Sequence, residues 1–225
     1  MKIGIVGAGN IGGTLAKRLT QLGHQVTIAN SRGPDTLGEV APRTGATPGT
    51  VEQALHGQEL VIVAIPQKAV PGLPKALFAA LPPGLPVIDT NNYYPHRDGT
   101  LAEIDVGMVE SRWVEMHLGH PVVKVFNTIY WTEIEALAKP AGAAGRVALP
   151  VAGDDPAAKR QVLALVDALG FDALDAGSID DSWRLQPGAP IHALYTDLAR
   201  AREALAAAQS EKIVEYRVRG TSNPD

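Results

Sequence analysis

The sequence contains no cysteine, and only 5% of its residues are aromatic. Without cysteine the chain can form no disulfide scaffold and no thiolate nucleophile, and it cannot hold zinc or an iron–sulfur cluster through sulfur. Long apolar runs are also missing, since the longest, LVIVAIP at 60–66, spans seven residues. A membrane helix needs about 18 to 20. The sequence therefore predicts a protein without a membrane span, and we expect it to be cytoplasmic.

An excess of positive charge is missing as well. Lys and Arg total 20 against 24 Asp and Glu, which gives a net charge of −4, and no block of like charges occurs. Surfaces that bind nucleic acid or anionic lipid need clustered cations, so both partners are disfavoured. The start of the chain, MKIGIVGAGNIGG, lacks the uninterrupted apolar core of a signal peptide, and we expect no cleaved leader.

Short apolar runs alternate with segments of helical period along the 225 residues. The apolar runs show no polar alternation, which is typical of parallel strands covered on both faces. This pattern predicts an α/β fold, a doubly wound, mostly parallel sheet with a smaller C-terminal α/β part. We expect strands at 3–6, 24–29, 60–65, 86–89, 122–126, 147–152 and 171–175. We expect helices at 11–22, 36–44, 51–56, 70–81, 110–118, 132–138, 157–169 and 191–209, with a polar loop at 91–107.

The segment GAGNIG follows the first expected strand and opens the first expected helix. Gly7 would allow the tight turn, Gly9 would let the backbone approach a pyrophosphate, and Gly12 would permit close packing of helix and strand. The first N–H groups of the helix would face the phosphates. The segment therefore predicts a dinucleotide site, although a turn built for packing alone is the alternative. The expected contacts are Gly7, Ala8, Gly9, Asn10, Ile11 and Gly12.

The end of the second expected strand carries Asn30, Ser31 and Arg32. Enzymes that bind NAD place a carboxylate there to accept a hydrogen bond from the ribose 2′-hydroxyl. An amide, a hydroxyl and a guanidinium instead suit a 2′-phosphate, because arginine matches phosphate geometry. We therefore predict NADP(H) as the cofactor. A solvated turn at Arg32 is the alternative.

Together with VIVAIP, VIDTNNYYPHRDG, VVKVFNTI, VAGDD and FDALDAGSI, these segments resemble the NADP oxidoreductase, coenzyme F420-dependent family over about residues 1–185. The resemblance implies hydride transfer between NADPH and a deazaflavin such as coenzyme F420, or a flavin, in a cleft. An NADP-binding Rossmann domain at 1–120 and a smaller domain at 121–225 would form that cleft. The chain departs from the family pattern at Ala8 and at 33–35. The domain is also similar to the NADPH-binding part of six-transmembrane metalloreductases.

Carried over by residue, the resemblance implies that Ser31 and Arg32 hold the 2′-phosphate and that Asn127 and Thr128 border the nicotinamide. Asn127 and Thr128 end an expected strand, where open α/β sheets bind ligands, and either could bond the carboxamide or an acceptor carbonyl. We treat them as the candidate catalytic residues, with a capping role for Thr128 as the alternative. Further cofactor contacts are expected at Ala64, Ile65, Pro66 and Asn91.

Other functions stay open. A carbonyl, imine or ferric reductase would also use NADPH, and reduction of a carbonyl or imine needs a proton donor, for which Lys124 is a candidate unless it points outward from its strand. A non-catalytic NADPH sensor would have its cleft filled, for example by Tyr93 and Tyr94. The segment 96–98, HRD, could bind an anionic acceptor or supply a proton, or be a solvated loop.

No metal site is predicted. His117 and His120 lie three residues apart with Glu115 nearby, but no further ligand is spaced to complete a set. The expected helix at 191–209 has an apolar face, which favours a homodimer. We expect the last residues, 218–225, to be frayed. The predicted partners are thus a small-molecule redox acceptor and a second copy of the chain.

Overall fold

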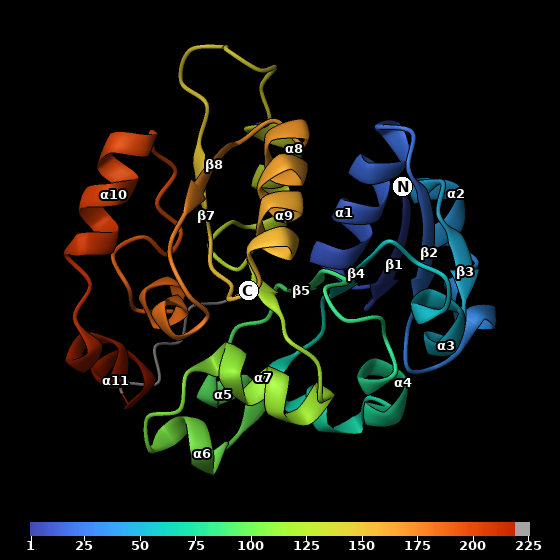
Figure 1. Ribbon diagram of the computed structural model, residues 1–225, viewed down its shortest axis with the longest axis horizontal. Coiled ribbons are helices and arrows are strands. Elements are labelled where there is room, and N and C mark those ends of the chain that lie inside the picture. Colours follow the sequence, from blue (N-terminus) through green and yellow to red (C-terminus); the bar gives the residue numbers. More distant parts are fainter. Residues whose placement is uncertain (219–225) are drawn as a thin grey trace.

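The computed structural model describes residues 1–218 and contains a six-stranded parallel sheet in the order β3-β2-β1-β4-β5-β6 (Figure 1). Its order reverses between β1 and β4, which is the doubly wound Rossmann arrangement that the sequence predicts. The strands are β1 (Lys2–Val6), β2 (Gln25–Ala29), β3 (Thr47–Gly49), β4 (Leu60–Val63), β5 (Val87–Asp89) and β6 (Val123–Lys124).

Both faces of this sheet are covered, and β4 shows why its sequence is apolar throughout. Leu60 and Ile62 belong to the core beneath α1, whereas Val61 and Val63 belong to the core beneath α3, α4 and α7. Each strand residue is therefore removed from water on one face or the other. The helices here are α1 (Asn10–Gln21), α2 (Val40–Thr44), α3 (Val51–Leu55), α4 (Lys75–Ala79), α5 (Pro95–Asp98), α6 (Ala102–Asp105) and α7 (Glu110–Leu118), with 3₁₀ turns η1 (Pro34–Leu37) and η2 (Gln67–Gly72).

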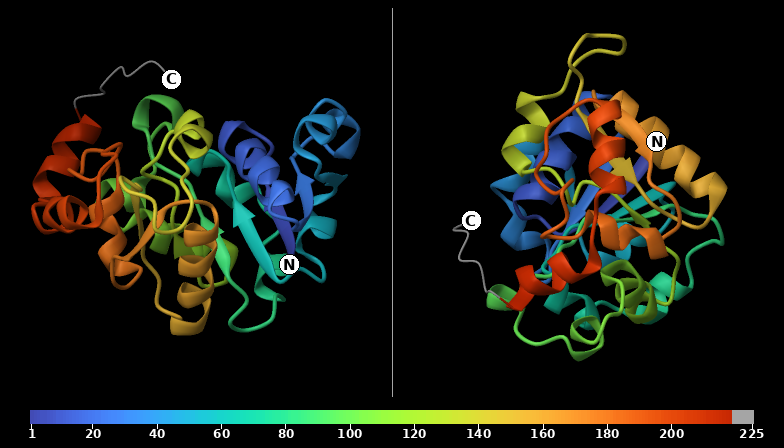
Figure 2. Two further views of the ribbon diagram at one scale, coloured as in Figure 1. Left: turned by 90° about the horizontal axis from the view of Figure 1, so that it is seen from above. Right: turned by 90° about the vertical axis from the view of Figure 1, so that its left-hand side faces the viewer.

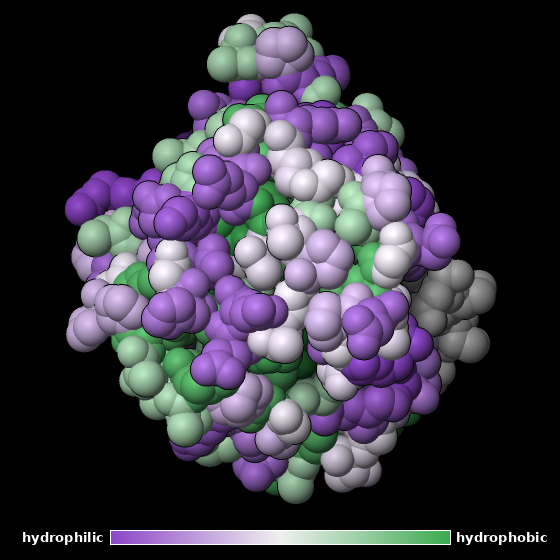
Figure 3. Space-filling model, turned by 90° about the vertical axis from the view of Figure 1, so that its right-hand side faces the viewer, coloured by the Kyte–Doolittle hydropathy of each residue, from purple (hydrophilic) through white to green (hydrophobic). Residues whose placement is uncertain are grey.

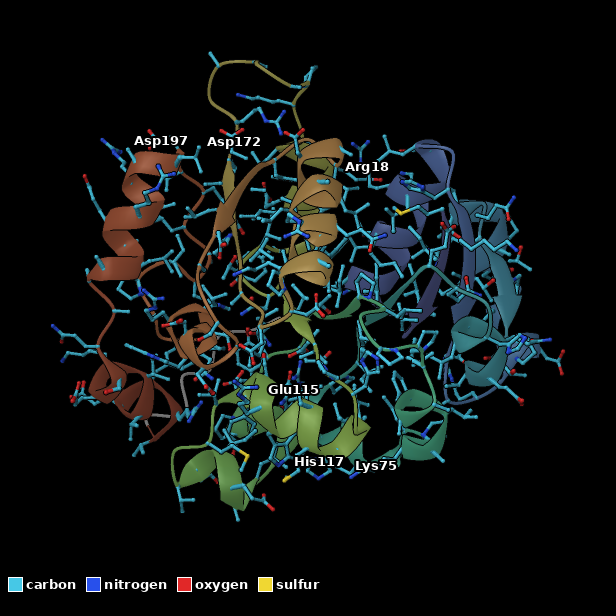
Figure 4. All side chains as sticks on the ribbon, in the orientation of Figure 1. Arg18, Lys75, Glu115, His117, Asp172 and Asp197 are labelled. Atoms are coloured by element: carbon cyan, nitrogen blue, oxygen red, sulfur yellow. The ribbon has the colours of Figure 1, made fainter. Side chains whose placement is uncertain are left out.

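A second, two-stranded parallel sheet, made of β7 and β8, lies beside the first, and α10 and α11 lie on its far side (Figures 1 and 2). Lys124 of β6 and Ala152 exchange backbone hydrogen bonds of 2.8 and 3.1 Å in antiparallel fashion, so the two sheets meet at this point. Arg18 of α1 also donates to the carbonyl of Leu169 at 3.4 Å (Figure 4). The elements are α8 (Trp131–Ala136), β7 (Ala148–Val151), α9 (Pro156–Ala168), β8 (Asp172–Asp175), η3 (Asp180–Leu185), α10 (Leu198–Ala206) and α11 (Ser210–Val218).

Several expected elements differ from those observed. The helix expected at 191–209 is wrong in its first part, because helix begins only at Leu198, where Asp197 caps it by accepting from Arg200 N. The expected helices at 36–44 and 70–81 are each divided into a 3₁₀ turn and a short α-helix, and Pro71 and Pro74 account for the second division. Strand β3 was not expected, and the loop at 91–107 contains α5 and α6.

The expected frayed end at 218–225 lies outside the described residues except for Val218, which ends α11. Among residues 1–218, no helix has both the length and the apolar character to span a bilayer. On the side of the molecule formed by the N-terminal elements, apolar residues are scattered among polar ones (Figure 3).

Candidate functional site

A cavity of about 450 Å³ opens at the carboxyl ends of the strands of the first sheet, beside the point where the strand order reverses. Ligands of open α/β sheets bind at this position. The cavity is bordered by the start of α1, by the turns that follow β4, β5 and β6, and by a segment just before α10. Nine residues predicted from the sequence line it: Gly9, Asn10, Ile11, Ala64, Ile65, Pro66, Asn91, Asn127 and Thr128.

The glycine turn between β1 and α1 has two tight positions and one open one. Gly7 has φ +119°, and a Cβ there would lie 2.0 Å from the carbonyl oxygen of Ala64. A Cβ on Gly12 would lie 1.9 Å from the carbonyl oxygen of Gly7, so these two glycines let the turn, α1 and the end of β4 pack together. A Cβ on Gly9 would meet nothing within 4 Å. Gly9 therefore leaves free space in front of the N-terminus of α1. Gly7, Ala8 and Gly12 are not among the residues that line the cavity.

The loop after β2 lies outside the cavity lining. Asn30 shapes this loop, since its Oδ1 accepts from the backbone N–H of Arg32 at 2.9 Å and its Nδ2 donates to Thr36 Oγ1 at 2.8 Å. Ser31 and Arg32 are exposed and extend from a loop that Asn30 holds in place. A cationic group is thus presented at the end of the strand next to β1.

Asn91 and Asn127 both line the cavity, and each has one buried side-chain atom without a partner. Asn91 is 3% exposed; its Oδ1 accepts from Ile65 N at 3.0 Å, while its Nδ2 has no partner within the described chain. Asn127 is 4% exposed; its Nδ2 donates to Asn92 Oδ1 and to the carbonyl of Leu185, while its Oδ1 has no partner among residues 1–218. A buried polar group without a partner is costly, so this free donor and this free acceptor are the lining atoms with unused capacity for a ligand.

Lys124 neither lines the cavity nor points outward from its strand. It is fully buried, and its Nζ pairs with Asp89 Oδ2 at 3.0 Å and donates to the carbonyl of Asn91. Asp89 also accepts from Ser111 Oγ at 2.8 Å and from Asn91 N at 2.9 Å. The role of proton donor in the cleft is therefore wrong for Lys124. This buried pair instead fixes the backbone at Asn91.

A further part of the cavity lining was named in the sequence analysis only among the alternatives, and its histidine was missed. Tyr94 and Arg97 come from the loop around α5, and Arg97 lies over the Tyr94 ring with its guanidinium carbon 5.0 Å from the ring centre. His192 comes from the segment before α10, about a hundred residues later, and its Nε2 lies 3.4 Å from the hydroxyl of Tyr94. The sequence analysis considered Tyr94 as a residue that fills the cleft and the segment 96–98 as an anion site, and the structure places Tyr94 and Arg97 in the lining. Nothing in the sequence placed His192 beside them.

Burial shapes the protonation of this part of the lining. It lowers the pKa of His192 to about 4, and the positive charge of Lys124 acts in the same direction. Burial likewise raises the pKa of Tyr94 above its usual range. At neutral pH both side chains are therefore uncharged.

Two cavity residues that are not glycine have left-handed backbones. Phe126 has φ +65° and Ala193 has φ +58°. Such residues are uncommon and cost of order 1 kcal/mol each, and they concentrate at functional sites. The backbone of Ala193 is held by a hydrogen bond of 3.0 Å from its N–H to the carbonyl of Thr128.

The histidines of the HLGH segment are bonded to the backbone. His117 Nδ1 lies 2.9 Å from the carbonyl of Trp113, and His120 Nδ1 lies 2.8 Å from that of Pro121 (His117 is labelled in Figure 4). Within residues 1–218 no group of three or more His, Asp or Glu side chains is placed to hold a metal ion.

Comparison with known proteins points to a redox family. The model of the NADP oxidoreductase, coenzyme F420-dependent family matches residues 2–93. The solved structure of the hypothetical protein SMa0349 from Sinorhizobium meliloti is 31% identical, with 87% of this chain and 95% of that chain covered and a TM-score of 0.72. A structure described as a candidate F420-dependent NADP reductase, from Arthrobacter sp. FB24, is 28% identical, covering 80% and 86%, with a TM-score of 0.67.

A curated relative, YjhV of Escherichia coli K12, is 51% identical over 51 residues, which are 23% of this chain. The matched stretch spans only 37% of YjhV. Imine reductases and a 3-hydroxyisobutyrate dehydrogenase are similar at 17 to 21% identity, a level that shows the fold alone. The family model covers the strand, glycine turn and SR pair singled out above, and the chain belongs to the NADP oxidoreductase, coenzyme F420-dependent family.

Proposed function

We propose that the protein binds NADP(H) in this cavity and transfers hydride between it and a deazaflavin such as coenzyme F420, or a flavin. The observation that carries the proposal is the pair of unsatisfied amide atoms, Nδ2 of Asn91 and Oδ1 of Asn127. A primary carboxamide such as that of nicotinamide has one acceptor and one donor, which complement this pair. Both atoms belong to residues of the cavity lining.

The remaining parts of the cofactor have matching places. A pyrophosphate would lie in the free space at Gly9, in front of the first N–H groups of α1. Ser31 and Arg32 are exposed at the end of β2, where they would bind a 2′-phosphate, on a loop that Asn30 shapes. Ala64, Ile65 and Pro66 would contact a ribose. Gly7, Ala8, Asn10, Ile11 and Gly12 would complete the turn around the phosphates.

The acceptor would lie near the start of α8. Tyr130 and Trp131 are 51% and 44% exposed at the cavity, and exposed aromatic faces can stack on a flat ring. In this proposal residues 1–120 supply the NADP(H) half and residues 121–225 complete the acceptor half. Thr128 would contact the nicotinamide or the acceptor.

In such a reaction the chain acts mainly by positioning. NADP(H), when bound, supplies or takes up the hydride. Asn91 and Asn127 would fix the carboxamide, and the Lys124–Asp89 pair holds Asn91 in place. Correct orientation of two reactants is worth several orders of magnitude in rate.

A direct test uses NADPH and its 3-acetylpyridine analogue, in which a methyl replaces the amide NH₂. We expect the wild type to bind the analogue about tenfold more weakly, because Oδ1 of Asn127 loses its donor. Asn127→Ala should bind both cofactors alike, and Arg160→Gln, at an exposed position on α9, serves as the matched surface control. Equal binding of the two cofactors by the wild type would refute the assignment of the amide pair.

The acceptor is tested by NADPH oxidation with coenzyme F420, FMN, FAD, ferric chelates and small carbonyl compounds, with NADH alongside. Turnover with the deazaflavin or a flavin supports the proposal. Turnover only with a ferric chelate, or binding without turnover, would refute the proposed acceptor and indicate a ferric reductase or an NADPH sensor. The expected homodimer can be checked by light scattering.

A further inference from the structure

The wall of the cavity formed by Tyr94, Arg97 and His192 has features that a hydride transfer between two rings does not require. The cavity lining contains one charged side chain, Arg97, and no carboxylate. It also contains a tyrosine and a histidine whose polar atoms are in contact. A fixed cation and a pair of neutral proton carriers together suggest a small anionic substrate that exchanges a proton.

Arg97 is held rigidly, and part of its guanidinium is left free. Its Nε and Nη2 bind Asp98 at 3.1 and 2.9 Å, and Nη2 also donates to the carbonyl of Asn92 at 2.7 Å. Its Nη1 has no hydrogen bond within the part of the chain that the structure describes. Because the Asp98 side chain is fully buried outside the lining, it orients Arg97 without placing an oxygen at the cavity.

A second cation lies close to Arg97. Lys68 donates from Nζ to the carbonyl of Arg97 at 2.5 Å and forms no ion pair within residues 1–218. Lys68 thus adds a second cationic side chain beside the guanidinium of Arg97. An arginine with an unbonded Nη1 and a second cation nearby suits a carboxylate, because guanidinium and carboxylate groups match in charge and geometry.

The hydrogen bonds of His192 define the direction of its contact with Tyr94. The Nδ1 of His192 faces the carbonyl of Leu185 at 3.4 Å, so Nδ1 carries the proton and Nε2 is the acceptor. The hydroxyl of Tyr94 therefore donates to Nε2. The lone pairs of the Tyr94 oxygen stay available to accept a hydrogen bond from a ligand hydroxyl. Apo distances of 3.4 Å are long, and such contacts commonly tighten when substrate binds.

We propose that this wall binds a small carboxylate-bearing alcohol or its keto acid, with Arg97 holding the carboxylate and the Tyr94–His192 pair exchanging the proton as NADP(H) exchanges the hydride. This further activity rests on the NADP(H) site proposed above and adds a second class of substrate to it.

In the direction of oxidation the substrate loses one hydride and one proton. The C–H bond of the alcohol carbon breaks and its electron pair leaves as hydride to NADP⁺, while the O–H bond breaks and its electron pair forms the carbonyl π bond. The hydroxyl proton passes to the oxygen of Tyr94, whose own proton passes to Nε2 of His192 and from there to solvent. In the direction of reduction each transfer is reversed. Because burial disfavours a charged imidazole, His192 returns to its neutral form after each cycle.

The test compares matched substrates. NADPH oxidation is followed with pyruvate and glyoxylate and with their methyl esters, which keep the carbonyl and lose the charge. We expect the acids to be reduced with kcat/KM at least about tenfold above the esters. Arg97→Gln should raise KM for the acids about 10- to 100-fold and leave the esters within about twofold, whereas Arg160→Gln should change neither.

The proton step has its own variants. Tyr94→Phe and His192→Gln should lower kcat by about 10² or more without weakening NADPH binding. Binding is read separately, by calorimetric titration of oxamate, a non-reactive carboxylate, into the complex with NADPH. We expect Arg97→Gln to weaken oxamate binding and Tyr94→Phe to leave it within about threefold.

The outcomes separate this inference from the proposed function. Normal NADPH binding and turnover with coenzyme F420 or FMN, but none with any keto acid, would overturn the inference and leave the proposed function intact. Equal loss of acid and ester turnover in Arg97→Gln would also overturn it. Failure to bind NADPH would overturn both.

Discussion

The two glycines at the start of α1 allow a prediction in which the same added methyl group has opposite effects. In Gly12→Ala the new Cβ would lie 1.9 Å from the backbone oxygen of Gly7, well inside contact distance, so α1 or the turn must shift. Overpacking of this kind costs about 1 to 3 kcal/mol. For a chain of this length each kcal/mol lowers Tm by about 2 to 4 °C. We therefore expect a fall in Tm of about 2 to 12 °C.

In Gly9→Ala the new Cβ meets no atom within 4 Å, and Gly9 has φ −76°, a value that alanine adopts freely. Its cost is the small difference between glycine and alanine at a helix N-cap, below about 1 kcal/mol. The methyl would, however, occupy the space proposed for the pyrophosphate, and we expect NADPH binding to weaken at least tenfold, that is by about 1.4 kcal/mol or more.

The assay is thermal unfolding followed by circular dichroism, together with titration of NADPH fluorescence. A Gly12→Ala protein that melts like the wild type would refute the packing argument. A Gly9→Ala protein that binds NADPH normally would show that the open space at Gly9 is not the phosphate site.

The loop after β2, the buried ion pair and the partly buried His192 give three further predictions. Arg32→Ala should weaken NADPH binding about 10- to 100-fold and leave NADH binding unchanged, and equal losses would place Arg32 outside the site. Lys124→Met should destabilise the fold by about 3 to 5 kcal/mol in denaturant unfolding, because Asp89 would be buried without its cation, and the further change Asp89→Leu should restore much of that loss. Because its pKa is lowered to about 4, His192 binds fewer protons in the folded than in the unfolded chain between pH 6.5 and 4. The free energy of unfolding is therefore unaffected by this group above pH 6.5. It falls by up to about 3 kcal/mol as the pH drops from 6.5 towards 4. His192→Gln should flatten this part of the pH–stability curve, and an unchanged curve would contradict the lowered pKa.

The N-terminal half of the fold could be predicted because its signals are local. The apolar run of β4 and the glycine turn each lie within a few residues. The run predicts a buried strand, and the turn between a strand and a helix predicts the start of a Rossmann unit. Strand β3 (Thr47–Gly49) was missed because three residues that include a proline carry no periodicity, and only pairing with β2 makes them a strand.

The C-terminal half shows the opposite case. The segment from Ile191 to Asp197 has apolar residues at helical spacing, yet Ala193 adopts a left-handed backbone and its N–H bonds Thr128. Tertiary contacts therefore override the periodicity there. Tertiary contacts also bring His192 to Tyr94, and the pairing of β5 with β6 brings Lys124 to Asp89, across separations that a sequence pattern cannot report.

The short strand β6 also bears on how the chain folds during synthesis. Val123 and Lys124 are the only residues of β6, and they cover the backbone of β5 on one side and meet Ala152 on the other. A nascent chain that has reached residue 120 would present β5 as an open edge with Asp89 lacking its cation, and open edges are sites of self-association. The proposed NADP(H) half, residues 1–120, thus relies on a strand that follows it, and we expect residues 1–120 alone not to form a complete folding unit.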